Sequence, residues 1–196
     1  SILVNGEPWV AAGWYYSLFD NAETNLTEFL ANQARMGMNT MMLYTFPLQM
    51  FHGEEWAARQ TRALDAADAV GMKILMDIEQ VTMPNVENTT EYWTEFEKAI
   101  QAVKDHPATL GYYICDDCCR FAGDNAVQAQ VYRAIKQLDP YHLTTGAVDG
   151  ACAADFTDGE GPGGMNTLSI DVPLNENYNP DLHARTGPEV SENTAN

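Results

Sequence analysis

Carboxylate and aromatic side chains recur at one kind of place along this chain, just after short apolar runs. The acidic residues at these places include Asp77, Asp116, Asp117 and Asp171, and the aromatic residues include Tyr15, Tyr44 and Phe46. Aromatic rings stack on the apolar faces of sugars, and carboxylates accept hydrogen bonds from hydroxyls or exchange protons with a reacting group. The pattern is compatible with a carbohydrate site. The alternative, that Asp residues at strand ends serve turns and caps, stays open.

The apolar runs are spaced as alternating strands and helices would be. We predict strands at 10–16, 40–46, 73–78, 110–115, 143–148 and 168–172, with helices at 25–36, 54–70, 89–103 and 125–138. The runs lack polar alternation, which is typical of parallel strands buried on both faces. Gly37 and Gly71 follow two of the helices, where a left-handed cap is favoured.

These elements predict an α/β fold in which right-handed crossovers join parallel strands. A barrel and an open doubly wound sheet both fit the pattern. No Gly-rich loop follows the first predicted strand, which disfavours a nucleotide-binding open sheet.

Several segments resemble the large retaining clan of TIM-barrel glycoside hydrolases. They are residues 3–9 with 13–16, then 105–117, 138–142 and 168–174. The resemblance implies a (β/α)8 barrel with about six of its eight units in residues 1–175, followed by an irregular polar tail at 176–196. It also implies a carbohydrate ligand and no cofactor.

The resemblance also implies roles for individual residues. In that clan the fourth strand ends in Asn-Glu or Asp-Glu, and the Glu is the general acid/base. Asp117 stands at that position, and Asp116 would contact the sugar or position Asp117. The residues that would contact the substrate are Tyr15, Tyr44, Phe46, Asp77 and Asp171.

The sequence departs from the clan in two respects. Asp117 is one methylene shorter than Glu, and no strand end that could carry the clan's seventh-strand nucleophile follows the sixth predicted strand. Either the nucleophile lies in sequence not given, or the protein is a barrel relative without hydrolase activity. An incomplete barrel would leave two strand edges unpaired, so we expect a missing segment, a second copy or another chain to cover them.

The charge balance narrows the class of partner. The 28 acidic and 10 basic residues give a net charge of −18, which disfavours nucleic acid and anionic membrane surfaces. No apolar run is long enough to cross a bilayer.

The four cysteines favour a disulfide over a metal. We expect Cys118 or Cys119 to pair with Cys152, with Cys115 as a buried thiol or a second partner. Zinc is the weaker alternative because no second well-spaced pair accompanies Cys115 and Cys118.

Other motifs bear on compartment and metal binding. Sequons at Asn25 and Asn88, together with the cysteines, predict a secreted glycoprotein. Asp155, Asp158 and Glu160 could bind calcium through oxygen ligands, but their spacing does not match an EF-hand, so we favour an acidic loop without metal. His106 and His142 precede predicted strands, and we expect structural roles for them at the edge opposite the carbohydrate site.

Overall fold

A computed structural model describes residues 2–16, 25–43, 53–78, 90–115, 124–149 and 170–176. The strands are β1 (Ile2–Val4), β2 (Glu7–Trp9), β3 (Gly13–Tyr16), β4 (Thr40–Leu43), β5 (Lys73–Asp77), β6 (Thr109–Tyr113), β7 (Leu143–Asp149) and β8 (Val172–Glu176). The helices are α1 (Leu26–Arg35), α2 (Gly53–Asp68), α3 (Thr90–Val103) and α4 (Asp124–Leu138). No helix in these ranges is long and apolar enough to span a membrane.

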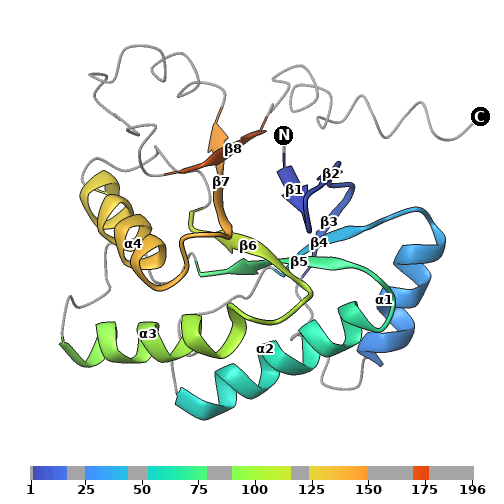
Figure 1. Cartoon of the computed structure of the whole chain (residues 1–196), viewed down its shortest axis with the longest axis horizontal. Coiled ribbons are helices and arrows are strands. Elements are labelled where there is room, and N and C mark those ends of the chain that lie inside the picture. Colours follow the sequence, from blue (N-terminus) through green and yellow to red (C-terminus); the bar gives the residue numbers. More distant parts are fainter. Residues whose placement is uncertain are drawn as a thin grey trace, which may run out of the picture.

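Strands β3 to β8 form one parallel sheet in the order of the sequence. A doubly wound sheet reverses its strand order part-way and carries helices on both faces. Here the order never reverses, and the four helices lie along the outer side of the curved sheet (Figure 1). The chain therefore has the α/β architecture of a half-barrel, and the barrel interpretation of the sequence is confirmed.

Five of the six predicted strands lie within three residues of the observed ones at both ends. The sixth prediction is wrong in position, because β8 begins at Val172, where the predicted strand ended. All four predicted helices are present, and Gly37 and Gly71 have positive φ at the ends of α1 and α2. The left-handed caps expected at these two glycines are thus confirmed.

Helix α1 illustrates why the helices begin where they do. The Asn25 side chain accepts a hydrogen bond from the Glu28 backbone N–H at 3.2 Å, which satisfies one of the unpaired donors of the first turn. The apolar stripe of the helix then turns toward the sheet and buries Leu30 completely.

The main core lies between the helices and the outer face of the sheet. Each helix contributes a fully buried residue, namely Leu30, Leu64, Ile100 and Ile135. From β5, Ile74 and Met76 enter this core, whereas Leu75 and Asp77 do not. Because side chains alternate along a strand, Leu75 and Asp77 face the concave side, which would be the interior of a barrel.

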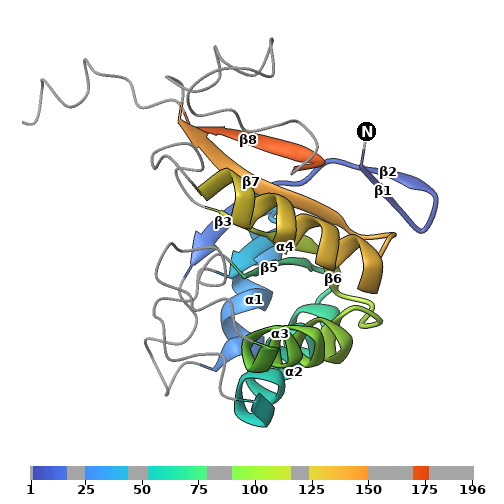
Figure 2. The same ribbon diagram turned by 90° about the vertical axis from the view of Figure 1, so that its left-hand side faces the viewer.

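A short hairpin, β1–β2, precedes the sheet and was not predicted. Asn5 and Gly6 both have positive φ, as a two-residue hairpin turn requires. Trp9 Nε1 donates to Thr40 Oγ1 at 3.1 Å, and Asn39 Nδ2 donates to the Val10 carbonyl at 2.8 Å. These bonds hold the hairpin beside the amino end of β4, and Figure 2 shows it on the side of the sheet away from α2 and α3.

Candidate functional site

Three polar side chains form a row across the concave face near the carboxyl ends of the strands. Asp77 is in register with Tyr113, and Tyr113 is in register with Thr145. All three residues are buried, Asp77 being 3% exposed. The carboxyl edge of a parallel sheet is where α/β barrels carry their sites. Asp77, predicted as a ligand-contacting residue, therefore lies at the expected edge, beside two residues that the sequence analysis missed.

Tyr15 and Asp77 do not share an environment. Tyr15 lies on β3, the first strand of the sheet, and is 70% exposed. Asp77 lies on β5, two strands away. The described structure brings both to one edge but leaves them separated by β4, so a ligand that contacts both would have to extend across that strand.

The other residues predicted for this edge fall outside the described part of the chain. They are Tyr44, Phe46, Asp116, Asp117, Cys118, Cys119 and Cys152. The predicted glycosylation site Asn88 lies outside it as well. Cys115 is described, and it is disulfide-bonded and buried. Of the two possibilities left open for Cys115, the structure has the disulfide rather than the thiol.

The placement predicted for Asp171 is wrong. Asp171 precedes β8 instead of following a strand, so it lies at the amino edge of the sheet. Its carboxylate is 2.5 Å from Lys136 Nζ and accepts a hydrogen bond from the Thr144 backbone N–H at 2.8 Å. Burial acts to raise the pKa of Asp171, but Lys136 and the Thr144 N–H outweigh burial and hold that pKa below its ordinary value. Asp171 ties α4 and β7 to the start of β8.

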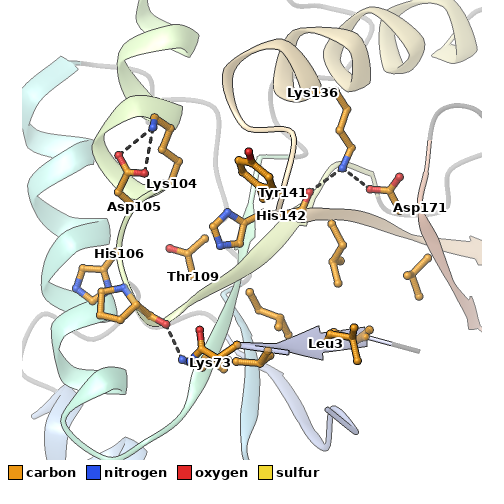
Figure 3. Close-up of a pocket in the computed structure, with 17 residues that line it drawn as sticks. Leu3, Lys73, Lys104, Asp105, His106, Thr109, Lys136, Tyr141, His142 and Asp171 are labelled. Carbon is orange, nitrogen blue, oxygen red and sulfur yellow. Dashed lines mark hydrogen bonds and ion pairs between the residues drawn. The ribbon is translucent and has the colours of Figure 1, made fainter. Parts of the chain in front are cut away.

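A cavity of about 770 Å³ lies at the amino edge of the sheet. Its walls come from strand starts, from helix ends and from the β1 hairpin. The charged residues in its lining are Lys73, Lys104, Asp105, Lys136 and Asp171, together with His106 and His142 (Figure 3). Three of the chain's four lysines therefore line one cavity in a protein of net charge −18.

The sequence contained a signal for this cluster. Lys73 is the first residue of β5, Lys104 directly follows α3, and Lys136 lies in the last turn of α4. Helix ends and strand starts meet at the amino edge of a βα fold, so cations at these positions converge. Lys104 and Lys136 also complement the negative ends of the helix dipoles.

Next to this cavity lies a buried hydrogen-bond network centred on Asp139. The carboxylate accepts bonds from the Tyr112 hydroxyl and from His142 Nδ1, both at 2.7 Å. It also accepts the backbone N–H groups of Tyr141 and His142, each at 3.2 Å. Burial acts to raise the pKa of Asp139, but the Tyr112 bond and the His142 contacts hold it below its ordinary value. The pKa of Tyr112 is raised far above its usual range. Burial is the largest cause, and the hydrogen bond to Asp139 is the next.

The two histidines next to strand starts have structural partners, as their positions predicted. His142 is oriented by Asp139, and His106 Nδ1 accepts the Ala108 backbone N–H at 3.1 Å. No group of three His, Cys, Asp or Glu residues in the described ranges is arranged to hold a metal ion.

A second, smaller pocket of about 390 Å³ lies between α3 and α4 on the outer surface. Trp93 and Phe96 form its apolar wall, and Arg133 and Glu97 lie at its sides. The rings of Trp93 and Phe96 meet edge to face at 5.5 Å. This geometry is that of a packed helix interface, and nothing in it points to a ligand.

In a comparison with solved structures, the fold is similar to the barrels of several glycosidases. The chain is similar to an FMN-binding β-glucuronidase from Facaelibacterium prausnitzii L2-6, with a TM-score of 0.55 and 17% identity over 93% of this chain and 27% of that one. A β-glucuronidase from Bacteroides uniformis matches with a TM-score of 0.60 and 16% identity over 88% of this chain and 21% of that one. The Pseudomonas stutzeri endoglucanase Cel5A, in complex with cellobiose, matches with a TM-score of 0.50 and 16% identity over 61% of this chain and 40% of that one.

These similarities show the fold of a partial TIM barrel. At 16–17% identity they show the fold alone. The chain spans about a quarter of the length of the β-glucuronidases it matches. No protein-family model matches the sequence, and no curated protein matches it.

Proposed function

We propose that the chain is part of a carbohydrate-active barrel that binds or hydrolyses a glycoside at the carboxyl edge of its sheet. The observation that carries the proposal is the buried Asp77–Tyr113–Thr145 row on the concave face, in a sheet that matches glycosidase barrels. A carboxylate, a phenol and a hydroxyl are groups that can exchange hydrogen bonds with sugar hydroxyls, which supply both donors and acceptors. Tyr15, Tyr44 and Phe46 would provide stacking surfaces at the same edge.

Asp117 is the candidate general acid/base, with Asp116 beside it. The order of the sheet supports this assignment, because β6 is its fourth strand and Asp117 follows β6 by four residues. In a retaining mechanism the acid protonates the leaving oxygen, and its carboxylate then activates water. The second carboxyl must lie about 5–5.5 Å away. It would come from sequence outside this chain.

A second candidate function is glycan binding or assembly without hydrolysis. The shorter side chain of Asp117 favours it, since a misplacement of about 1 Å can cost roughly a hundredfold in rate. Strands β3 and β8 are the outer strands of the described sheet, and β3 carries the exposed Trp14 and Tyr15. We expect these edges to be covered by a further segment, by a second copy or by another chain.

The decisive experiment compares Asp117→Asn with Asp105→Asn in the native protein. Asp105 is an 83% exposed carboxylate at the opposite edge, so its variant controls for the loss of one negative charge. Hydrolysis and binding are measured on a panel of β-glucosides, β-glucuronides and β-mannosides, with folding followed by circular dichroism. Hydrolysis lost only in Asp117→Asn supports catalysis. Binding without hydrolysis in all three proteins supports the second candidate, and neither binding nor hydrolysis in the wild type contradicts both.

The intact mass of the native protein tests the remaining expectations. A mass well above 21.7 kDa after deglycosylation would mean that further sequence is present to supply a nucleophile and close the barrel. A mass decrease on deglycosylation would support glycans at Asn25 or Asn88 and hence secretion. Asn25 is exposed at the start of α1, and only its side-chain oxygen is used by the cap, so its amide nitrogen can carry a glycan.

A further inference from the structure

The cavity at the amino edge of the sheet concentrates positive charge in an otherwise strongly acidic protein. Lys73, Lys104 and Lys136 lie on three sides of it, with Thr109 and His142 between them (Figure 3). Its volume of about 770 Å³ is within the range of small-molecule sites. A cleft lined by one sign of charge attracts ligands of the opposite sign.

The acidic residues that line the cavity neutralise the positive charges of the three lysines to different extents. Lys136 is fully engaged, because it lies 2.5 Å from Asp171 and donates to the His142 carbonyl at 2.7 Å. Lys104 pairs with Asp105 at 2.9 Å, but Asp105 is 83% exposed while Lys104 is 23% exposed. The acid of that pair is solvated and screened, so its neutralising effect on the cavity is small.

Lys73 has no carboxylate partner in the described part of the chain. Its ammonium donates to the Pro107 carbonyl at 2.6 Å, which uses one of its three N–H groups and leaves the charge uncompensated. Unlike Lys104 and Lys136, Lys73 begins a strand, so helix-dipole stabilisation does not explain its position. Asn5 of the hairpin lines the same cavity.

We propose that this cavity binds a small molecule through a compact oxyanion group, a phosphate, sulfate or carboxylate, with Lys73 as its principal charged contact. Lys104 supplies the flanking positive charge. The site lies at the end of the strands opposite Tyr15 and Asp77, and it does not depend on the proposed carbohydrate function.

The test is a titration of the full chain with inorganic phosphate, sulfate and glucuronate, each at constant ionic strength. Binding is followed by calorimetry or by amide chemical shifts. The test variant is Lys73→Met, and the matched control is Lys98→Met. Lys98 is the one lysine that does not line the cavity, and its ammonium pairs with Glu95 at 2.6 Å. Lys98 is exposed and Lys73 is half-buried, and thermal melts verify that both variants fold.

We expect at least one of the three anions to bind saturably. Loss of a charge-assisted hydrogen bond predicts that Lys73→Met weakens that binding about tenfold or more, while Lys98→Met leaves it unchanged. Preference for phosphate or sulfate over glucuronate would identify a tetrahedral oxyanion, and the reverse would identify a carboxylate. The proposal is overturned if none of the anions saturates, or if the two variants bind alike.

Discussion

The Asp139 network yields the sharpest test of the structure. Replacing Tyr112 with Phe removes one hydroxyl from a fully buried ring and changes little else, because the ring packs in the core between the helices and the sheet. The lost bond runs from the phenol to a carboxylate at 2.7 Å. Hydrogen bonds to charged groups contribute about 1.5–3 kcal/mol, so we expect the free energy of unfolding to fall by about that amount.

For a chain of this length such a loss lowers the melting temperature by roughly 3–12 °C. The assay is urea unfolding followed by circular dichroism, with thermal melts as a second measure. Tyr141→Phe is the control, because Tyr141 is 93% exposed and should change stability by less than about 0.5 kcal/mol. Equal effects of Tyr112→Phe and Tyr141→Phe would refute the role given to the buried bond.

A double-mutant cycle separates the bond from the packing of the ring. Asp139→Ala removes the acceptor and leaves the buried Tyr112 hydroxyl unpaired, which we expect to cost about 3–5 kcal/mol. In that background Tyr112→Phe removes an unsatisfied group and should be neutral or stabilising. A cost equal to the cost in the wild type would mean that the hydroxyl and the carboxylate do not interact.

The pKa of Asp139 gives this prediction a pH dependence. The folded pKa of Asp139 is depressed, so its contribution to stability is present above the unfolded pKa of about 3.9 and is lost as pH falls through the folded value. The Tyr112 bond contributes to that depression. The stability difference between wild type and Tyr112→Phe should therefore be largest near neutral pH and shrink in acid below pH about 4.

Other substitutions test the remaining parts of the fold. Gly111→Ala would place a Cβ against the Leu143 carbonyl oxygen and 2.8 Å from its Cγ, so we expect a loss of at least about 1–3 kcal/mol in urea unfolding. A loss no larger than that of Gly37→Ala, about 1 kcal/mol, would contradict the strand packing. Leu64→Ala should cost about 3–5 kcal/mol, whereas Leu3→Ala, at a 60% exposed site, should cost far less. Asp171→Asn should cost about 1 kcal/mol at pH 7, since its ion pair with Lys136 is partly exposed, and the difference should vanish in acid because the pKa of Asp171 is lowered.

Most of the half-barrel could be predicted because its elements follow local patterns. Lys73–Asp77 is a short apolar run buried on both faces, and the helices carry apolar stripes that end at Gly37 and Gly71. Strand β8 does not follow that pattern. It contains Pro173 and Asn175. Among the described strands it pairs with β7 alone, and an outer strand tolerates a proline that a central strand would exclude. The residues just before β8 are more apolar, and for that reason the predicted strand began four residues before the observed one.

The hairpin was predictable from its turn, because Asn5-Gly6 between short apolar segments is a strong hairpin signal. The Asp139 network was not. Asp139 follows α4 in an Asp-Pro turn, and its link to Tyr112 spans 27 residues. The two come together only in the folded core, which Tyr112 shares with Val131 and Ile135 of α4. For the same reason, the placement of Asp171 beside Lys136 depends on where β8 begins, which the local pattern misjudged.

The two proposed sites can be tested separately because the strands separate them. Lys73 and Asp77 are the first and last residues of β5, about 13 Å apart along a strand that rises about 3.3 Å per residue. That distance exceeds the Debye length of about 10 Å at 0.1 M salt, so a charge change at one edge has little effect at the other. Asp117→Asn should therefore leave anion binding unchanged, and Lys73→Met should leave any glycan binding or hydrolysis unchanged. If Lys73→Met also altered glycan turnover, the cavity and the carboxyl edge would belong to one site, and the independence argued here from their separation would be wrong.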